Sequence, residues 1–243
     1  MKKPSIIPTL PVRGDIVIGR IESIRNRMAA AAERSGRPAD SVRLVAVTKT
    51  VAASRVAAAI DAGVDAIGEN YIQEAREKAA ELGNRQVTWH FIGHLQSNKA
   101  KIAVKLFDLI HSVDRFKLAA ELNKQAAKAD KCQQILVQVN TGSEATKSGA
   151  DAGETLALVQ RISRLEHLKV CGLMTLPPFF DAPEKVRPYF RMLRDLRDRI
   201  RREAIAGVGM ETLSMGMTGD FEAAIEEGAT LVRIGTAIFG ERR

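Results

Sequence analysis

Lys49 is the side chain whose type and position allow the most specific chemistry. It stands near the end of LVAVTKT at 44–50, a β-branched run that predicts a buried strand. A lysine at a strand end usually extends its amine to solvent. If the side chain points into a barrel instead, loss of hydration favours the neutral amine, a nucleophile for aldehydes. The position therefore allows either a solvated lysine or a Schiff-base lysine.

Two later runs carry donors for an anion. LSMGMTGD at 213–220 places hydroxyls and glycines directly before a predicted helix, and VRIGT at 232–236 ends the last strand-like run. Helix N-termini bind anions, and the loops after the last two strands of a barrel often hold phosphate. The same residues also serve as ordinary helix caps, so both interpretations stay open. The candidate anion contacts are Ser214, Thr218, Gly235 and Thr236.

Arg233 shares a strand face with Gly235 and is therefore expected near the same pocket. Its structural interpretation is an ion pair with a carboxylate. Its functional interpretation is a permanent cation that keeps the nitrogen of a bound ring unprotonated. His90 and His94 lie on one face of the expected third strand, where a core role, ring stacking and proton transfer stay open. Their spacing resembles a helical zinc pair, but a strand does not present it that way, which disfavours a metal.

The alternation of short apolar runs with longer amphipathic ones predicts the fold class. All eight strand-like runs except the last precede a helical pattern, which favours parallel pairing. Eight such units in this length are what a closed (β/α)₈ TIM barrel requires. An open doubly wound sheet is the alternative, although no G-x-G-x-x-G follows the first run. The runs are 44–50, 66–70, 88–94, 109–114, 134–140, 169–176, 212–217 and 231–236.

The barrel is expected to be one α/β domain over 15–243, preceded by a flexible arm over 1–14. The amphipathic stretch 16–32 predicts an additional N-terminal helix, which covers the place of the helix missing after the eighth strand. Asn70 and Asn140 end the second and fifth expected strands, and active sites of barrels lie at that face.

Composition limits the remaining classes of protein. Of 243 residues, 45% are hydrophobic and 27% charged, which is typical of a globular chain. Cys132 and Cys171 have no ligand-spaced neighbours, which disfavours a disulfide framework and favours a reducing compartment. No segment resembles a signal peptide or a membrane span, so a cytoplasmic protein without a membrane partner is expected.

A basic helix with seven arginines is expected over 183–206, in a chain whose net charge is +8. An outer barrel helix with a solvated basic face is the favoured interpretation. A nucleic-acid surface is the alternative, although acidic residues interrupt the run and exposed aromatic residues are lacking.

Seven runs between residues 42 and 240 form a specific combination. They are TKT around Lys49, GENYIQEAREK at 68–78, WHFIGHLQSNK at 89–99, VNTGSEATKSG at 139–149, GLMTL at 172–176, LSMGMTGDFEAAIEEG at 213–228 and LVRIGTAIFG at 231–240. Together they resemble the pyridoxal phosphate homeostasis protein family. That family is similar in fold to the barrel of alanine racemase, a fold-type III protein that binds pyridoxal 5'-phosphate (PLP).

The resemblance implies that Lys49 holds PLP as a Schiff base and that Arg233 is the partner of the pyridine nitrogen. It implies phosphate contacts from Ser214, Thr218, Gly235 and Thr236, and a pocket wall that includes Asn70. His94 is counted among the candidate cofactor-binding residues because its ring could stack or move a proton. Lys147 resembles a second lysine near the site that would serve cofactor transfer. The chain departs from the family pattern in reading Thr48-Lys49-Thr50, where Ser-Lys-Thr is frequent, and in having Thr218 where serine is usual.

The expected function is therefore reversible holding of PLP, with buffering or delivery to apo PLP-dependent enzymes in vitamin B6 homeostasis. No catalytic residue is assigned, because an arginine at the ring nitrogen disfavours carbanion chemistry and the seven residues after Thr236 leave no room for a second acid/base domain. The first alternative is a weak racemase-like enzyme with His94 or Lys147 as base. The second is a basic nucleic-acid-binding protein.

Overall fold

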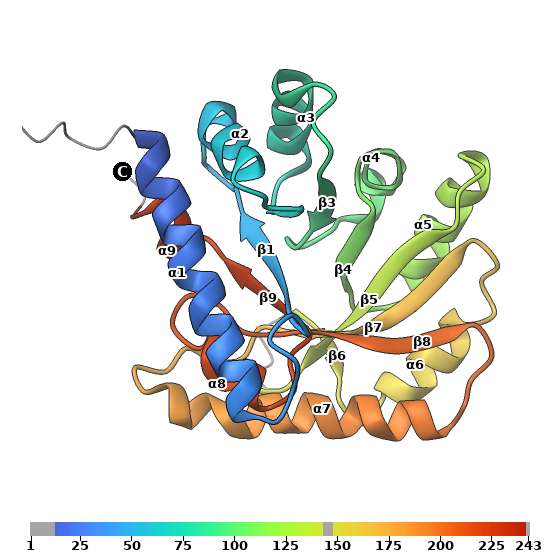
Figure 1. Ribbon diagram of the computed structural model, residues 1–243. Coiled ribbons are helices and arrows are strands. Elements are labelled where there is room, and N and C mark those ends of the chain that lie inside the picture. The colour runs from blue at the N-terminus through green and yellow to red at the C-terminus, as the bar shows by residue number, and fades with distance from the viewer. Residues whose placement is uncertain (1–12, 143–147, 242–243) are drawn as a thin grey trace, which may run out of the picture.

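Eight parallel strands close into a barrel in the computed structural model, which describes residues 13–142 and 148–241 (Figure 1). The barrel strands are β1 (Arg43–Val47), β2 (Ala66–Glu69), β3 (Thr88–Phe91), β4 (Leu109–Val113), β5 (Gln133–Asn140), β7 (Leu168–Thr175), β8 (Val208–Ser214) and β9 (Leu231–Ile234). The ring closes because β1 pairs with both β2 and β9, and β4 pairs with β5. The predicted (β/α)₈ barrel is confirmed.

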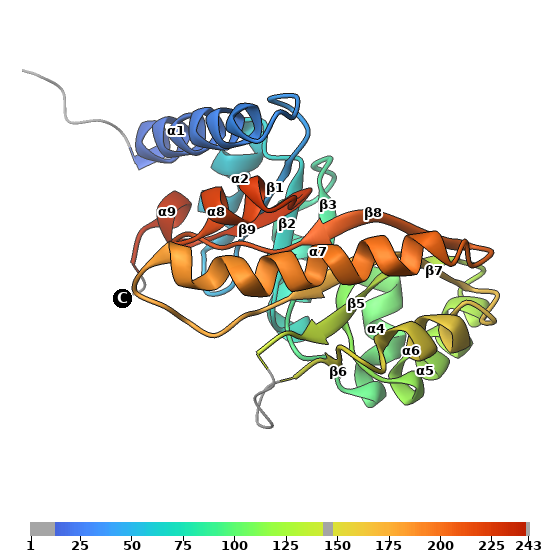
Figure 2. The same ribbon diagram turned by 90° about the horizontal axis from the view of Figure 1, so that it is seen from below.

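Helices surround the strands on the outside of the barrel (Figures 1 and 2). The α-helices are α1 (Arg13–Arg34), α2 (Ala53–Asp61), α3 (Ile72–Leu82), α4 (Ala100–Leu106), α5 (Phe116–Lys128), α6 (Thr155–Ile162), α7 (Arg187–Arg202), α8 (Phe221–Glu226) and α9 (Thr236–Phe239). Two 3₁₀ turns, η1 (Ser97–Lys99) and η2 (Pro183–Val186), precede α4 and α7. The strands are buried on both faces, because the helices cover the outer face and the other strands enclose the inner one. Most of the buried strand residues are apolar, and the exceptions include His90, His111 and Arg233.

The N-terminal helix replaces the outer helix that the last strand lacks. Helix α9 has a single turn, and α1 packs against α8, α9 and α2 at that place (Figure 1). Val17, Ile21, Ile24 and Met28 recur at helical spacing and are buried there. The predicted additional helix is confirmed. Most of the arm predicted over 1–14, and all of Lys147, lie outside the described residues.

Two strand ends differ from the sequence prediction. Strand β1 ends at Val47 and β3 at Phe91, so Lys49 and His94 lie beyond the strands in which they were expected. The expectation that His90 and His94 share one strand face is therefore wrong. A further short strand, β6 (Ala150–Asp151), pairs with β5 and has too few residues to leave a sequence pattern.

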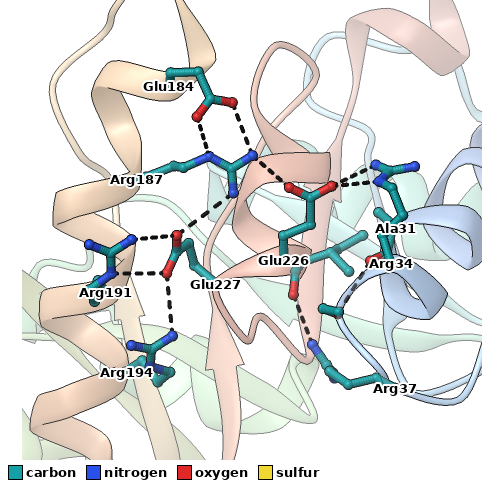
Figure 3. A network of polar contacts seen from close by, with 11 residues as sticks. Ala31, Arg34, Arg37, Glu184, Arg187, Arg191, Arg194, Glu226 and Glu227 are labelled. Atoms are coloured by element: carbon teal, nitrogen blue, oxygen red, sulfur yellow. Dashed lines mark hydrogen bonds and ion pairs between the residues drawn. The ribbon is translucent and has the colours of Figure 1, made fainter.

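Part of the positive charge of the basic helix is paired within the fold. Arg187, Arg191 and Arg194 of α7 all form ion pairs with Glu227, and Arg187 also pairs with Glu226 (Figure 3). Arg197 pairs with Asp198 beside it. The apolar stripe of α7 (Phe190, Leu193, Leu196 and Ile200) is buried, as expected for an outer barrel helix. Four of the seven arginines that suggested a nucleic-acid surface therefore already have carboxylate partners.

Within the described ranges, no helix is both long and apolar enough to cross a lipid bilayer.

Candidate functional site

A cavity of about 320 Å³ opens where β1, β2 and β9 end. Six of the residues predicted from the sequence line it: Lys49, Asn70, Thr218, Arg233, Gly235 and Thr236. The other lining residues are Val47, Ile92, Leu176, Phe179, Phe180, Met217, Gly219 and Asp220. The volume lies at the small end of the range for small-molecule pockets. Because Asn70 and Gly235 directly follow their strands, and Lys49 follows by two residues, parallel strands bring the three together.

Lys49 lies on a tight turn directly after β1. The Val51 N–H donates to the Thr48 carbonyl at 3.0 Å and closes the turn. Thr50 has φ of 60°, in the left-handed region that favours glycine. Lys49 is half-buried and lines the cavity from this turn. The turn, rather than the end of a strand, thus sets the direction of the Lys49 side chain.

Arg233 enters the cavity from β9 and is only 3% exposed. Its Nη1 donates to Ser214 Oγ at 2.5 Å, and its Nη2 donates to the Thr175 carbonyl at 2.9 Å. Burial lowers the pKa of Arg233 to about 10, an effect that Asp220 opposes. The guanidinium therefore keeps its proton at neutral pH. Both of its hydrogen-bond partners are neutral, and the carboxylate that acts on it, Asp220, also lines the cavity.

Two buried histidines continue the contacts of Arg233 into the barrel. His111 Nδ1 lies 3.0 Å from Ser214 Oγ, and His111 Nε2 lies 3.0 Å from His90 Nδ1. An arginine only donates, so Ser214 accepts from Arg233 and can give its own hydrogen to His111 Nδ1. His111 then donates from Nε2 to His90. Burial lowers the pKa of His90 to about 3 and that of His111 well below its usual value, so both rings are neutral.

The loop between β8 and α8 brings Thr218 to the cavity through a glycine. Gly216 has φ of 94°, and a Cβ on it would lie 2.6 Å from Ala224 Cβ. Only glycine allows α8 to approach the end of β8 this closely. Asp220 Oδ1 accepts from the Met217 N–H at 2.6 Å and fixes the loop. Burial raises the pKa of Asp220.

The remaining predicted residues lie away from the cavity lining. Ser214 is fully buried, and its hydroxyl contacts Arg233 and His111. His94 is exposed and lines a neighbouring pocket that shares Asn70 with the cavity. Asn140 ends β5, and its Oδ1 accepts from the Gly142 N–H at 3.2 Å. The roles of Ser214 and His94 toward a cofactor stay predictions.

Sequence reasoning missed His111, which is fully buried in β4 between Ser214 and His90. It also missed Glu69 and Lys78, which form a buried ion pair behind the Lys49 turn. A histidine or a carboxylate inside a strand is the signal that could have found His111 and Glu69, because such groups are buried only with partners. Lys78 lies on helix α3 and leaves no such signal.

Comparison with known proteins assigns the family. Residues 20–243 match the family described as alanine racemase, N-terminal domain. The pyridoxal phosphate homeostasis protein of Aquifex aeolicus is 45% identical over 224 residues, which cover 92% of this chain and 97% of that protein.

Solved structures agree with this match. PipY of Synechococcus elongatus, solved with PLP bound, is 34% identical with a TM-score of 0.82, over 92% of this chain and all of that one. An alanine racemase of Clostridium difficile is 16% identical with a TM-score of 0.71, over 94% of this chain and 57% of that one, and shares the fold. The chain belongs to the family of pyridoxal phosphate homeostasis proteins, within the larger group that shares the alanine racemase barrel.

Proposed function

We propose that the protein binds PLP in the 320 Å³ cavity, with Lys49 as its covalent anchor, and holds it reversibly. The observation that carries the proposal is the meeting of Lys49, Arg233 and two threonine hydroxyls in one cavity of a chain 45% identical to a PLP homeostasis protein.

The residues of the cavity fit a small aromatic aldehyde with an anionic group. Arg233 supplies a cation, and Thr218 and Thr236 supply hydroxyl donors. Ile92 and Phe180 supply apolar surface for a ring. The Oδ1 atom of Asn70 is buried and has no hydrogen-bond partner within the described residues, as expected of a group that a ligand would satisfy.

When bound, PLP supplies an aldehyde that condenses with a lysine amine to a Schiff base. Lys49 provides that amine at the mouth of the barrel. Thr218, Gly235 and Thr236 would bind the phosphate group through hydroxyl and backbone donors. Because the hydroxyl of Ser214 contacts Arg233 and His111, a phosphate contact from Ser214 would come from its backbone.

Arg233 supports a carrier rather than an enzyme. It retains its own proton, because its pKa of about 10 lies well above neutral pH. It would therefore leave a neighbouring ring nitrogen unprotonated, which weakens PLP as an electron sink. On this basis we propose that the protein buffers PLP and delivers it to apo PLP-dependent enzymes. We also propose, from the resemblance to the family, that Lys147 assists the transfer, and we propose a cytoplasmic location.

The test compares wild type with Lys49→Ala. Titration with PLP should give wild type a visible absorbance band and a saturable Kd, and both should be lost in Lys49→Ala. Holoprotein should restore the activity of an apo PLP-dependent enzyme without turning over amino acids itself. Amino-acid turnover that Lys49→Ala abolishes would instead favour the racemase-like enzyme.

A further inference from the structure

Two buried charged side chains and a partly exposed one lie directly behind the turn that carries Lys49. Lys78 of α3 is 4% exposed and forms an ion pair with Glu69, the fully buried last residue of β2. Lys78 Nζ also lies 3.0 Å from Glu74 Oε1, one helical turn earlier. Glu69, Glu74 and Lys78 are called the charged cluster below. None of the three lines the cavity, and the binding scheme above does not use them.

Each member of the cluster also bonds to the turn. Lys78 Nζ donates to the Thr48 carbonyl at 2.7 Å, and the Thr48 hydroxyl donates to Glu69 Oε1 at 2.6 Å. On the other side, the Thr50 N–H donates to Glu74 Oε1 at 2.5 Å. The cluster therefore holds the residues on both sides of Lys49.

We propose that the charged cluster is a positioning device for Lys49, which fixes the turn so that the Lys49 amine stays at the cavity. This inference rests on the proposed function, because it assigns Glu69, Glu74 and Lys78 a role in presenting the amine that binds PLP.

The backbone at Thr50 explains why such a device is needed. A threonine with positive φ persists only where its surroundings fix it, and the fixing contact here is the bond to Glu74. Charge-assisted hydrogen bonds are the stronger kind and define direction, which apolar contacts do not. Glu69 Oε2 is buried and has no hydrogen-bond partner in the described part of the chain. An arrangement optimised only for stability would not leave a buried acceptor unsatisfied, so the cluster is expected to have a further role.

The contacts within the cluster also keep Lys78 from competing with Lys49 for an aldehyde. An ammonium group has three N–H donors, and those of Lys78 have three acceptors: the Thr48 carbonyl, Glu69 and Glu74. Its amine therefore has no free lone pair for an aldehyde. Two lysines lie close to one turn, and only Lys49 faces the cavity.

The test uses Glu74→Ala, which removes the acceptor for the Thr50 N–H from a partly exposed side chain. Glu81→Ala is the matched control, because Glu81 is an exposed glutamate of the same helix. The first readout, without PLP, is hydrogen exchange at the Thr50 amide. The second is the rate at which PLP with borohydride labels Lys49. Glu74→Ala should speed the exchange and slow the labelling about tenfold, as a misplaced reacting group does.

Glu74→Gln keeps an acceptor oxygen and should restore both readouts. If Glu74→Ala does not fold, Glu74→Asp decides, because its shorter carboxylate keeps the charge but withdraws from Thr50. If Glu74→Ala and Glu81→Ala show the same exchange rate at the Thr50 amide and the same labelling rate of Lys49, the positioning role is overturned. Failure of the proposed function is distinguishable, since wild type itself would then show no label on Lys49.

Discussion

The two cationic residues of the cavity are held in opposite ways. Lys49 sits on a turn held by the charged cluster, in which one buried lysine pairs with two carboxylates. The hydrogen bonds of Arg233 go instead to neutral groups, Ser214 and the Thr175 carbonyl, with the neutral pair His111 and His90 behind Ser214.

The difference separates two ways of positioning a residue. At the Lys49 turn one ammonium pairs with two carboxylates, so ionic contacts fix the backbone and part of the negative charge is cancelled. Around Arg233 the hydrogen-bond partners are neutral, and the charge that acts on the guanidinium is that of Asp220, another residue of the cavity lining. The first region should therefore depend on paired charges, and the second on neutral rings.

The largest effect is expected from Lys78→Met, which breaks the charged cluster. It leaves Glu69 buried and unpaired, so the free energy of unfolding should fall by about 3–5 kcal/mol. Denaturant unfolding of the protein without PLP measures this. The double variant Lys78→Met, Glu69→Gln should recover more than half of the loss. A double variant no more stable than the single one would show that the ion pair is not the cause.

Lowering the pH should destabilise the histidine pair behind Arg233 and not the charged cluster at the Lys49 turn. His90 has a pKa lowered from 6.5 to about 3, so the unfolded chain takes up a proton before the folded one as pH falls below 6.5. Its contribution to stability is present above pH 6.5 and is lost on the way down to about pH 3, by about 2 kcal/mol at pH 5. Burial raises the pKa of Glu69, which has the opposite sign.

His90→Asn keeps an acceptor for His111 and should reduce the fall in unfolding free energy between pH 7 and 5. The part that remains comes from His111, whose pKa burial also lowers. His167→Asn serves as its control, because His167 is outside the barrel interior. If both variants keep the wild-type slope, the buried histidine pair does not set the acid response.

Arg233→Gln tests whether the charge of Arg233 contributes to PLP binding. Glutamine keeps hydrogen-bonding capacity and removes the charge, so the Kd for PLP should rise about tenfold, as loss of a hydrogen bond from a charged group does. The absorbance band of bound PLP should also shift. Arg85→Gln, an exposed arginine, provides the comparison. An unchanged spectrum with an unchanged Kd would make Arg233 a structural residue.

The smallest effect is expected outside both regions, at the paired arginines of α7. Glu227→Gln weakens three ion pairs that are partly exposed, so stability should fall by about 1 kcal/mol, and less in 1 M salt. PLP binding should stay unchanged, since Glu227 lies outside the cavity. A raised Kd for PLP in this variant would contradict the separation of the site from the basic helix.

The sequence predicted the barrel because short, mostly apolar runs alternate with longer amphipathic segments that have helical periodicity. It predicted six cavity residues because polar groups that follow barrel strands converge at one mouth. The sequence did not predict the direction in which individual side chains point. Ser214 turns toward His111, 103 residues away, and the Lys49 turn depends on Lys78 of a later helix. Such contacts follow from strand register and helix placement, which a one-dimensional pattern does not contain.

The most direct test of the central claim is reduction of the PLP-loaded protein with borohydride, followed by mass mapping of its peptides. The pyridoxyl group should be found on the peptide that contains Lys49, and the peptide that contains Lys78 should remain unmodified. A pyridoxyl group on another lysine, with Lys49 unmodified, would contradict the assignment of the cavity.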